Sequence, residues 1–332
     1  DVRGSACVPA MLTLLLIGAT ALAQPSCPGT ATLSVFAENL SDVSAIDVAV
    51  DGELAPDAAT CLGTGATSYQ QTLTCMGKGI VRCGEVGGLR PGLWVHRLRV
   101  AVPGSDPQEQ AQRRVLVASD PSEVLNAVVW TVYPRTLVVS NTSSDASPGS
   151  LRAQLQAVAN GPALITFARN RFPCPDTPDV IDLDRGCDCG SNVGGGLCVA
   201  GSGIVVDALD CHGLPGGVVW SVGARRLSVL CVTGGDNVFR GLVFDGSQDP
   251  QNSRMQVDTV FVTGSGAQRD RIEQSIVRGP TFGDAVSVNN GAGLAGADQD
   301  AILILDNEIT RGRDRGVKVN AAAATIARSC VH

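Results

Sequence analysis

Hydrophobic positions in the C-terminal third of the chain recur in one short pattern. Each copy predicts a β-branched strand, and the first three are followed by a turn glycine eight places after their starts. Recurrence at periods of about 20–50 residues predicts a stacked repeat, in which short strands are stabilised by their neighbours. The sequence numbers of the starts give steps of 33, 33 and 22 (271−238, 304−271, 326−304). The copies are Val238–Phe244, Arg271–Val277, Ile304–Thr310 and Ile326–His332, and the glycines are Gly246, Gly279 and Gly312.

The unequal steps predict a rung of about 22 residues with a loop of about 11 residues inserted in places. Asn289–Asp300, rich in Gly, Asn and Asp, is the expected loop. Because stacked turns bring equal offsets together, the spacing predicts that Ile276 and Ile309 share an inward column. A second strand face is expected from four valines: Val286, Val288, Val317 and Val319.

Residues 24–135 carry a different pattern, with partial alternation of apolar and polar residues. Clusters such as Asp51–Gly52 and Arg90–Gly92 separate the apolar runs as turns. Several short strands at this spacing predict a small antiparallel β-sandwich. The runs are Thr32–Phe36, Ile46–Val50, Tyr69–Thr74, Trp94–Val102, Arg114–Ala118 and Val128–Val132.

The N-terminus has the features of a secretory signal peptide. The apolar run Met11–Ala23 ends in an A-x-A pattern and follows a positive charge. The run is short for a bilayer span. We predict a signal peptide at residues 1–23 and a mature chain, from Gln24, without a transmembrane span. The chain also stops within a repeat at His332, which predicts further rungs beyond it.

Composition and charge narrow the functional class. Hydrophobic residues make up 44% of the 332 residues, which is ample for a core. Aromatics at 4% and 39 glycines suit closely spaced strands and frequent turns. The net charge of −7 argues against nucleic acid or an anionic membrane surface as a partner, because both favour a basic face.

Cysteine usage agrees with export. Even numbers of cysteines in two segments of an exported protein predict disulfides, although spacing does not decide the pairing. The alternative is a metal site from Cys187, Cys189, Cys198 and Cys211–His212. No C-x-x-C pair is present, and structural zinc sites usually show that spacing, so no metal is expected here. Cys330 is left over and is expected to pair with a residue beyond His332. The disulfide candidates are Cys27, Cys61, Cys75, Cys83, Cys174, Cys187, Cys189, Cys198, Cys211 and Cys231.

A short helix is predicted near the start of the second segment. Ser147 or Ser150 can cap it, and a strand at Ala163–Phe167 follows. Apolar side chains at spacings of four and three give it one buried face. These residues are Leu151, Leu155 and Val158.

Asp145, the run Pro148–Arg152 and Asn160 stand in this segment at the spacing of a known opening motif. The segment thereby resembles the opening of bacterial secreted right-handed parallel β-helix proteins of the pectin-lyase-like superfamily. Asn237–Val243 is similar to a rung of that family. The resemblance covers residues 136–332 and implies that a cap at about 141–167 closes one end of the coil. Separately, Gly88–His96 resembles a strand entry of immunoglobulin-like modules, which implies an Ig-like module before the coil. The residues that match the opening motif are Asp145, Pro148–Arg152, Ala157, Asn160, Ile165 and Phe167.

The resemblance also suggests candidate chemistry, because the superfamily includes polysaccharide lyases and glycoside hydrolases. Lyases combine calcium-binding acids with an Arg or Lys that takes a proton beside a uronate carboxylate. A solvated charged face is the alternative interpretation. Gly283–Val288 resembles a hydrolase motif, but Ala285 replaces its second acid. The lyase-type candidates are Asp284, Asp306, Arg311, Asp314 and Lys318, with Arg313 and Arg315 nearby, and weaker calcium candidates are Asp207, Asp210, Asp236 and Asp245.

Two function classes follow. The first is a secreted or cell-surface β-helix scaffold without catalytic activity, which binds extracellular polysaccharide or a component of the bacterial cell envelope. The second is a calcium-dependent lyase or a glycoside hydrolase acting on acidic polysaccharide. The acid missing at Ala285 and the lack of a sharp catalytic constellation favour the first class.

Overall fold

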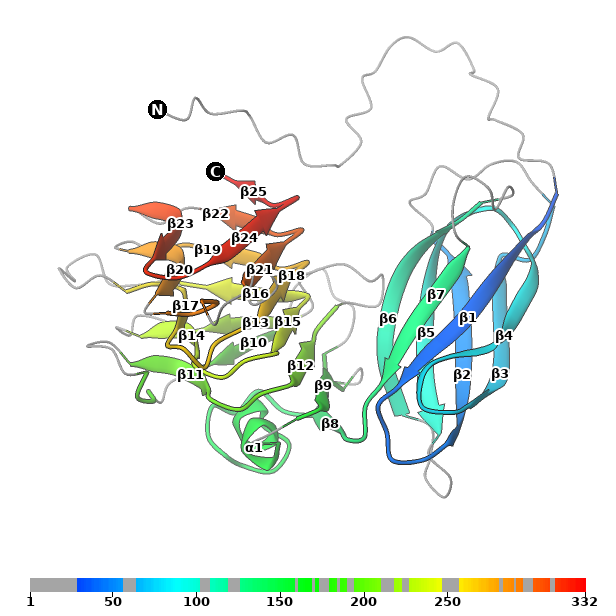
Figure 1. Ribbon diagram of the computed structural model, residues 1–332, viewed down its shortest axis with the longest axis horizontal. Helices are drawn as coiled ribbons and strands as arrows, with labels where there is room; N and C mark the ends of the chain where they lie inside the picture. Colours follow the sequence, from blue (N-terminus) through cyan, green and yellow to red (C-terminus); the bar gives the residue numbers. More distant parts are fainter. Residues whose placement is uncertain are drawn as a thin grey trace, which may run out of the picture. The chain divides into compact units, whose positions relative to one another are not determined.

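The described residues fall into two compact units, 29–136 and 137–332, shown in Figure 1. None of their helices is long and apolar enough to cross a membrane. Residues 1–23, Cys27, Cys61, Cys174, Asp210, Cys211, His212, Arg311, Arg313 and most of the expected loop Asn289–Asp300 lie outside the described part. The computed structural model describes residues 29–55, 64–101, 108–118, 126–158, 161–168, 171–172, 179–183, 186–189, 194–209, 218–222, 227–246, 257–280, 283–289, 291–294, 301–310 and 314–332.

Alternating burial builds two sheets in the first unit. Side chains from both sheets share one core, with Leu33, Trp130, Val48 and Trp94 completely buried. Strand pairing is antiparallel throughout except between the first and last strands, which are parallel. One sheet contains, in order, β4 (Gly79–Leu89), β1 (Ala31–Asn39) and β7 (Ala127–Val132). The other contains β3 (Ser68–Met76), β2 (Ala45–Leu54), β5 (Gly92–Ala101) and β6 (Gln108–Val117).

All six predicted strands of this unit are present, and the sequence pattern missed β4. Four glycines interrupt its alternation, and its pairing with β1 shifts register between Val35 and Phe36. A disulfide between Cys75 of β3 and Cys83 of β4 joins the two sheets. The bond therefore stabilises the strand that has the weakest pattern.

The second unit is a coil of parallel strands, consistent with a parallel β-helix (Figure 1). From β9 onward, each complete turn contributes one strand to each of three sheets, and every registered pair is parallel. Sheet 1 contains β11 (Gly195–Val199), β14 (Ser228–Val232), β17 (Val260–Thr263), β20 (Asp284–Asn289) and β23 (Arg315–Asn320). Sheet 2 contains β8 (Thr136–Val139), β9 (Ala163–Phe167), β12 (Ile204–Asp207), β15 (Val238–Arg240), β18 (Arg271–Glu273), β21 (Ile302–Leu305) and β24 (Ala324–Ala327). Sheet 3 contains β10 (Asp179–Asp182), β13 (Val218–Ser221), β16 (Leu242–Asp245), β19 (Ile276–Arg278), β22 (Glu308–Thr310) and β25 (Cys330–Val331).

The observed register corrects one step of the predicted repeat. Arg271 lies opposite Leu303, so its predicted alignment with Ile304 is wrong by a single position. Successive side chains of a strand point to opposite faces, and a slip of one position therefore exchanges them.

The slip changes which residue faces the core of sheet 3. Val277, and not Ile276, shares the inward column with Ile309, while Ile276 lies opposite Glu308. The predicted valine columns are confirmed, because the two valines of β20 lie opposite the two of β23. These pairs are Val286 with Val317 and Val288 with Val319.

A short helix, α1 (Leu151–Ala157), lies at the β8–β9 end of the coil (Figure 1). Ser150 caps it, since its Oγ accepts a hydrogen bond of 3.1 Å from the Ala153 N–H. The three apolar residues predicted for its inner face join the core of the first rungs, as expected for a cap. These are Leu151, Leu155 and Val158.

The first residue of the turn between sheet 2 and sheet 3 has a left-handed backbone conformation in four successive rungs. Gly241 has a φ of 73°, and three non-glycine residues occupy the same left-handed region in the rungs that follow. A side chain in this region costs about 1 kcal/mol or more, so the surrounding contacts must hold it there. The three residues, with φ of 47°, 56° and 49°, are Gln274, Asp306 and Arg328.

A buried polar column directly after this turn supplies those contacts. The Ser275 N–H donates to Asn307 Oδ1 at 2.9 Å, and the Asn307 N–H donates to Ser329 Oγ at 3.1 Å. Asn307 Nδ2 donates to the Ile272 carbonyl at 2.7 Å. Each rung is therefore tied to its neighbour through side chains as well as through the strands.

We predict that Asn307→Ala destabilises the coil by about 2–4 kcal/mol. The substitution removes the side-chain amide that binds the buried Ser275 N–H and the buried Ile272 carbonyl, and both groups lose their hydrogen bond. Urea denaturation followed by far-UV circular dichroism measures the change. Asn320→Ala, at an exposed position of β23, is the matched control and should change stability by less than about 0.5 kcal/mol. Equal effects of the two substitutions would contradict the role of the column.

Candidate functional site

The structure brings three of the lyase-type candidates together on β20 and β23, the last two strands of sheet 1, and on the turn before β23. Asp284, Asp314 and Lys318 lie on the turns and strands β20 and β23, and Lys318 Nζ is 3.7 Å from the Asp284 carboxylate. Asp258, which the sequence pattern did not indicate, joins them by accepting the Asp284 N–H at 2.9 Å. The Asp314 N–H donates to the Gly283 carbonyl at 3.3 Å.

The electrostatics of this cluster centre on Asp284, whose side chain is completely buried. Burial, followed by the nearby charge of Asp258, raises the pKa of its carboxyl above the ordinary range, and Lys318 opposes this shift. A buried acid with a raised pKa can hold a proton, but a polymeric substrate has no access to it. The arrangement is better suited to joining two rungs than to binding calcium or sugar.

Asp306 does not belong to this cluster. It forms the turn between β21 and β22, where its carboxylate pairs with the Arg328 guanidinium through two hydrogen bonds of 2.6 and 2.7 Å. Asp284 instead begins a strand of sheet 1. The candidates of the described chain therefore divide between two corners of the coil.

Aspartates of the coil pair with arginines one rung later. Three of these pairs have the same sequence spacing, 33, and the fourth has the shorter spacing, 22, that the repeat also shows. They include all the calcium candidates that the structure describes, so each of these carboxylates already has a cationic neighbour. The pairs, with their N–O distances, are Asp207–Arg240 at 3.3 Å, Asp236–Arg269 at 2.6 Å, Asp245–Arg278 at 3.7 Å and Asp306–Arg328 at 2.6 Å.

Arg240 forms the most buried of these contacts. It lies between Asp207 and Glu273 in the outer column of sheet 2. The side chains of Asp207, Arg240 and Glu273 are only 5%, 14% and 12% exposed. One guanidinium therefore neutralises two carboxylates on the rungs before and after it. A search for opposite charges at the repeat spacing could have found this triad in the sequence.

A second buried polar column lies at the turn between sheet 1 and sheet 2. Asn237 Oδ1 accepts the Ile204 N–H at 3.0 Å, and Asp270 Oδ1 accepts the Asn237 N–H at 2.8 Å. Asp270 Oδ2 is buried and has no hydrogen-bond partner among the described residues. The pKa of Asp270 is raised to about 7, mainly because the carboxyl group is buried. The hydrogen bonds from Asn237 lower this pKa. The charge of Asp236 raises it and the charge of Arg269 lowers it, both by smaller amounts.

Disulfides cross-link the first rungs of the coil. The described cysteines of this unit pair as Cys187–Cys198 and Cys189–Cys231. Cys330 is also disulfide-bonded, so the expectation that it awaits a residue beyond His332 is wrong.

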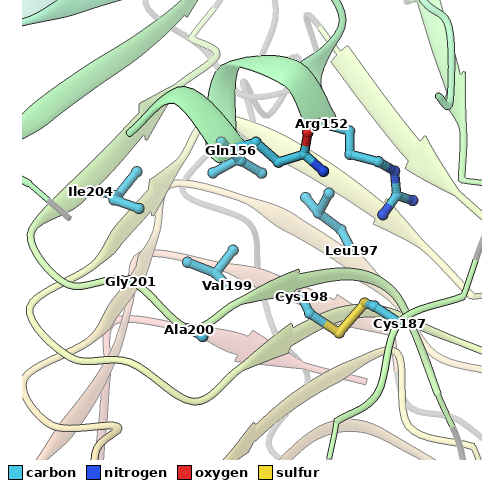
Figure 2. Close-up of a pocket in the computed structure, with 10 residues that line it drawn as sticks. Arg152, Gln156, Cys187, Leu197, Cys198, Val199, Ala200, Gly201 and Ile204 are labelled. Carbon is cyan, nitrogen blue, oxygen red and sulfur yellow. A yellow bond between two sulfur atoms is a disulfide. The ribbon is translucent and has the colours of Figure 1, made fainter. Parts of the chain in front are cut away.

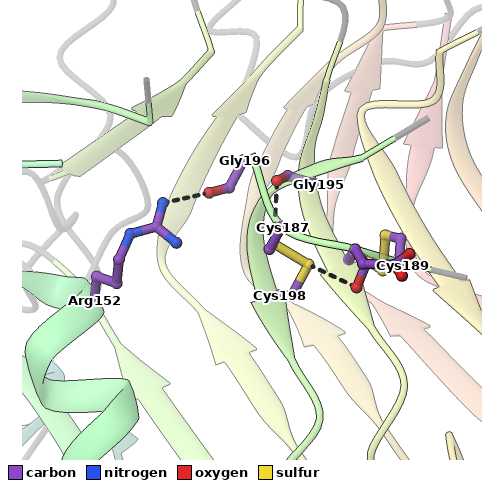
Figure 3. The surroundings of a disulfide bond; sticks show 8 residues. Arg152, Cys187, Cys189, Gly195, Gly196 and Cys198 are labelled. Carbon is purple, nitrogen blue, oxygen red and sulfur yellow. Dashed lines mark hydrogen bonds between the residues drawn. A yellow bond between two sulfur atoms is a disulfide. The ribbon is translucent and has the colours of Figure 1, made fainter. Parts of the chain in front are cut away.

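A cavity of about 380 Å³ lies between α1 and the strands β11 and β12 (Figure 2). Arg152, Leu155 and Gln156 line its helix side, and the Cys187–Cys198 disulfide lies on its strand side. The Arg152 guanidinium donates to the Ser144 carbonyl at 2.9 Å. It also donates to the Gly196 carbonyl at 2.8 Å (Figure 3). Arg152 therefore fastens the helix to the first described strand of sheet 1.

Comparison with known proteins gives no further assignment, because no family model, curated protein or solved structure matches this chain.

We predict that Arg240→Met destabilises the coil by about 3–5 kcal/mol, because it leaves two largely buried carboxylates without their cation. Arg269→Met is the matched control: its ion pair with Asp236 is roughly half exposed, and its loss should cost less than about 1 kcal/mol. Urea denaturation midpoints of the two variants measure the difference. A control that is as destabilised as Arg240→Met would contradict the ranking by burial.

The pKa of Asp270 predicts a pH dependence of stability. Between its ordinary value of 3.8 and about 7, the folded state keeps a proton that the unfolded chain has released. The free energy of unfolding therefore falls as the pH rises through this window. Asp270→Asn should remove this loss and exceed the wild type in stability near neutral pH, by on the order of 3 kcal/mol.

Urea denaturation across this pH range measures the effect. Asp236→Asn is a control whose effect on stability should depend on pH in the opposite direction, because the hydrogen bond from Arg269 lowers the pKa of Asp236. Its stabilising contribution is present at neutral pH and is lost as the pH falls. A wild type and an Asp270→Asn variant with parallel pH profiles would show that the column carries no titrating proton.

Proposed function

We propose that this protein is a secreted or cell-surface β-helix scaffold that binds glycan or other cell-envelope components without catalysing a reaction. The coil is of the right-handed, pectin-lyase-like kind, and the first unit is an Ig-like β-sandwich. Right-handed connection is the strong preference for parallel strands joined by crossovers. Cysteines paired in disulfides fit an exported chain, as do the apolar N-terminal run and its cleavage pattern.

One observation carries the non-catalytic proposal: five of the candidate acids make contacts with cations of the next rung. Four aspartates face arginines of the next rung, and the buried Asp284 faces Lys318. A lyase needs carboxylates open to calcium and a basic residue open to substrate. Here the same residue types hold the stack together, which favours a rigid scaffold.

The binding surface that we propose is the row of turn residues between sheet 2 and sheet 3. Gln274, Asp306 and Arg328 are exposed, and each is held in the same backbone conformation on successive rungs. Rungs of a parallel coil stack about 4.8 Å apart, so the row presents amide, carboxylate and guanidinium groups at a regular interval. Such groups offer donors and acceptors to sugar hydroxyls.

The alternative, a calcium-dependent enzyme acting on acidic polysaccharide, has one specific observation in its favour. Asp258, Asp284 and Asp314 contribute to one electrostatic cluster with Lys318, whose side chain is 24% exposed. In such an enzyme Lys318 is the residue that would take the proton. A test of function must therefore include a variant at this position.

Retention on immobilised polysaccharides tests the proposal, using the full oxidised chain and a panel that includes uronate-containing polymers. We expect retention without formation of unsaturated product, whether or not calcium is present. The double variant Asp306→Ala/Arg328→Ala should bind about tenfold more weakly, equivalent to about 1.4 kcal/mol. Asp236→Ala/Arg269→Ala, which removes a matched ion pair at another turn, should bind like the wild type.

The enzymatic alternative predicts a different outcome in the same assay. Unsaturated product that requires calcium and disappears in Lys318→Met would overturn the non-catalytic proposal. Absence of both retention and product across the panel would overturn glycan binding itself. Equal loss of retention in the two double variants would contradict the assigned surface.

A further inference from the structure

Four cysteine sulfurs gather at one corner of the coil. Cys187 and Cys189 come from the segment before β11, Cys198 lies in β11, and Cys231 lies directly opposite Cys198 in β14. The Sγ atoms of Cys189, Cys198 and Cys231 all lie within 4.8 Å of one another, and Cys187 Sγ is bonded to Cys198 Sγ. One disulfide therefore closes the segment before β11 onto β11, and the other joins that segment to β14 on the next rung (Figure 3).

We propose that this corner, which two disulfides cross-link in the structure, has a second cross-linked state. In that state the four cysteines are reduced and together bind one soft divalent cation such as Zn²⁺. Zinc prefers tetrahedral thiolate coordination with Zn–S distances of about 2.3 Å, which places the sulfurs about 3.8 Å apart. Three of the four sulfurs, those of Cys189, Cys198 and Cys231, already lie within 4.8 Å of one another, and Cys187 Sγ is bonded to one of them, so the fourth ligand has only to move away from Cys198. The Cα atoms within each disulfide are 6.0 and 6.1 Å apart, so the side chains can open around an ion without separating the strands.

The surroundings provide shielding on one side and access on the other. Cys189 and Cys231 are buried against Phe261, which excludes water from half of the corner. Cys187 and Cys198 instead line the 380 Å³ cavity under α1, which offers a route for an ion or a reductant (Figure 2). Four thiolates around Zn²⁺ carry a net charge of −2, and Arg152 in the cavity wall contributes an opposite charge.

The exchange between the two states is balanced by a dithiol reductant. Each protein disulfide gains two electrons and two protons, while one dithiol is oxidised to its own disulfide. Zn²⁺ then displaces one proton from each of the four thiols and forms four Zn–S bonds. The same corner is held by metal under reducing conditions and by two disulfides under oxidising conditions. This inference does not depend on the proposed function.

Co²⁺ binding to the reduced full-length chain tests the proposal, because tetrahedral thiolate coordination gives Co²⁺ intense visible absorption. The chain is reduced with dithiol, freed of reductant without oxygen and titrated with Co²⁺. We expect one tetrahedral Co²⁺ per chain, displaced by Zn²⁺, with far-UV circular dichroism still showing β structure. Cys75→Ser/Cys83→Ser, which removes the disulfide of the first unit, is the matched control and should keep this signal.

Two double variants remove ligands from the corner itself: Cys187→Ser/Cys198→Ser and Cys189→Ser/Cys231→Ser. Each should lose the tetrahedral signal and weaken Co²⁺ binding by more than about tenfold. Cys198→His supplies an alternative ligand and should keep tetrahedral binding with shifted bands, which distinguishes ligation from a purely structural role. Unchanged Co²⁺ spectra in the two double variants, no tetrahedral signal in the wild type, or a signal only in unfolded chain would each overturn the proposal.

Discussion

The register of stacked parallel strands is the constraint on which the coil depends. Each residue lies opposite the equivalent residue of the next turn, so one choice of register decides which side chains meet in the core and which meet at the surface. Inward columns such as Val277 with Ile309 remain apolar only in this register. The same alignment places Asp207 beside Arg240 and Asn307 beside Ser275. Apolar packing, ion pairs and buried amides therefore all select one stacking.

This constraint also explains why five aspartates of the described rungs lie beside a cation of the next rung. Although the chain carries a net charge of −7, Asp207, Asp236, Asp245 and Asp306 each lie beside an arginine one rung away. Burial decides what each contact contributes, since the triad around Arg240 is shielded from water and the pair of Asp236 with Arg269 is not. Residues that resemble catalytic groups in the sequence are thereby used for cohesion between rungs. Asp306 and Arg328 make such a contact and are also exposed, and with Gln274 they form a regular row that suits recognition of an extended polar ligand.

Two corners of the coil hold groups whose state depends on solution conditions. Asp270 is buried with one oxygen lacking a partner among the described residues, and its pKa is raised to about 7. The cysteine corner holds two disulfides, and three of its four sulfurs lie within 4.8 Å of one another. Both are positions where one column of the stack contains a titratable or oxidisable group instead of an apolar one. Protons and redox conditions can therefore act on the rungs without a separate regulatory element.

The sequence by itself determined the periodic strands, the capping helix with its apolar face, the valine columns and the presence of disulfides, because these depend on local alternation and spacing. Only the tertiary structure showed that one repeat is a residue shorter than predicted, so that Val277, and not Ile276, faces the core. The loop between the two rungs can lose one residue without any change in the local pattern of either strand. The tertiary structure also decided that Asp284 is buried beside Lys318 while Asp306 pairs with Arg328 at another corner. Residues one rung apart meet only after the coil has closed, and their burial, which sets both pKa and accessibility, exists only in the folded stack.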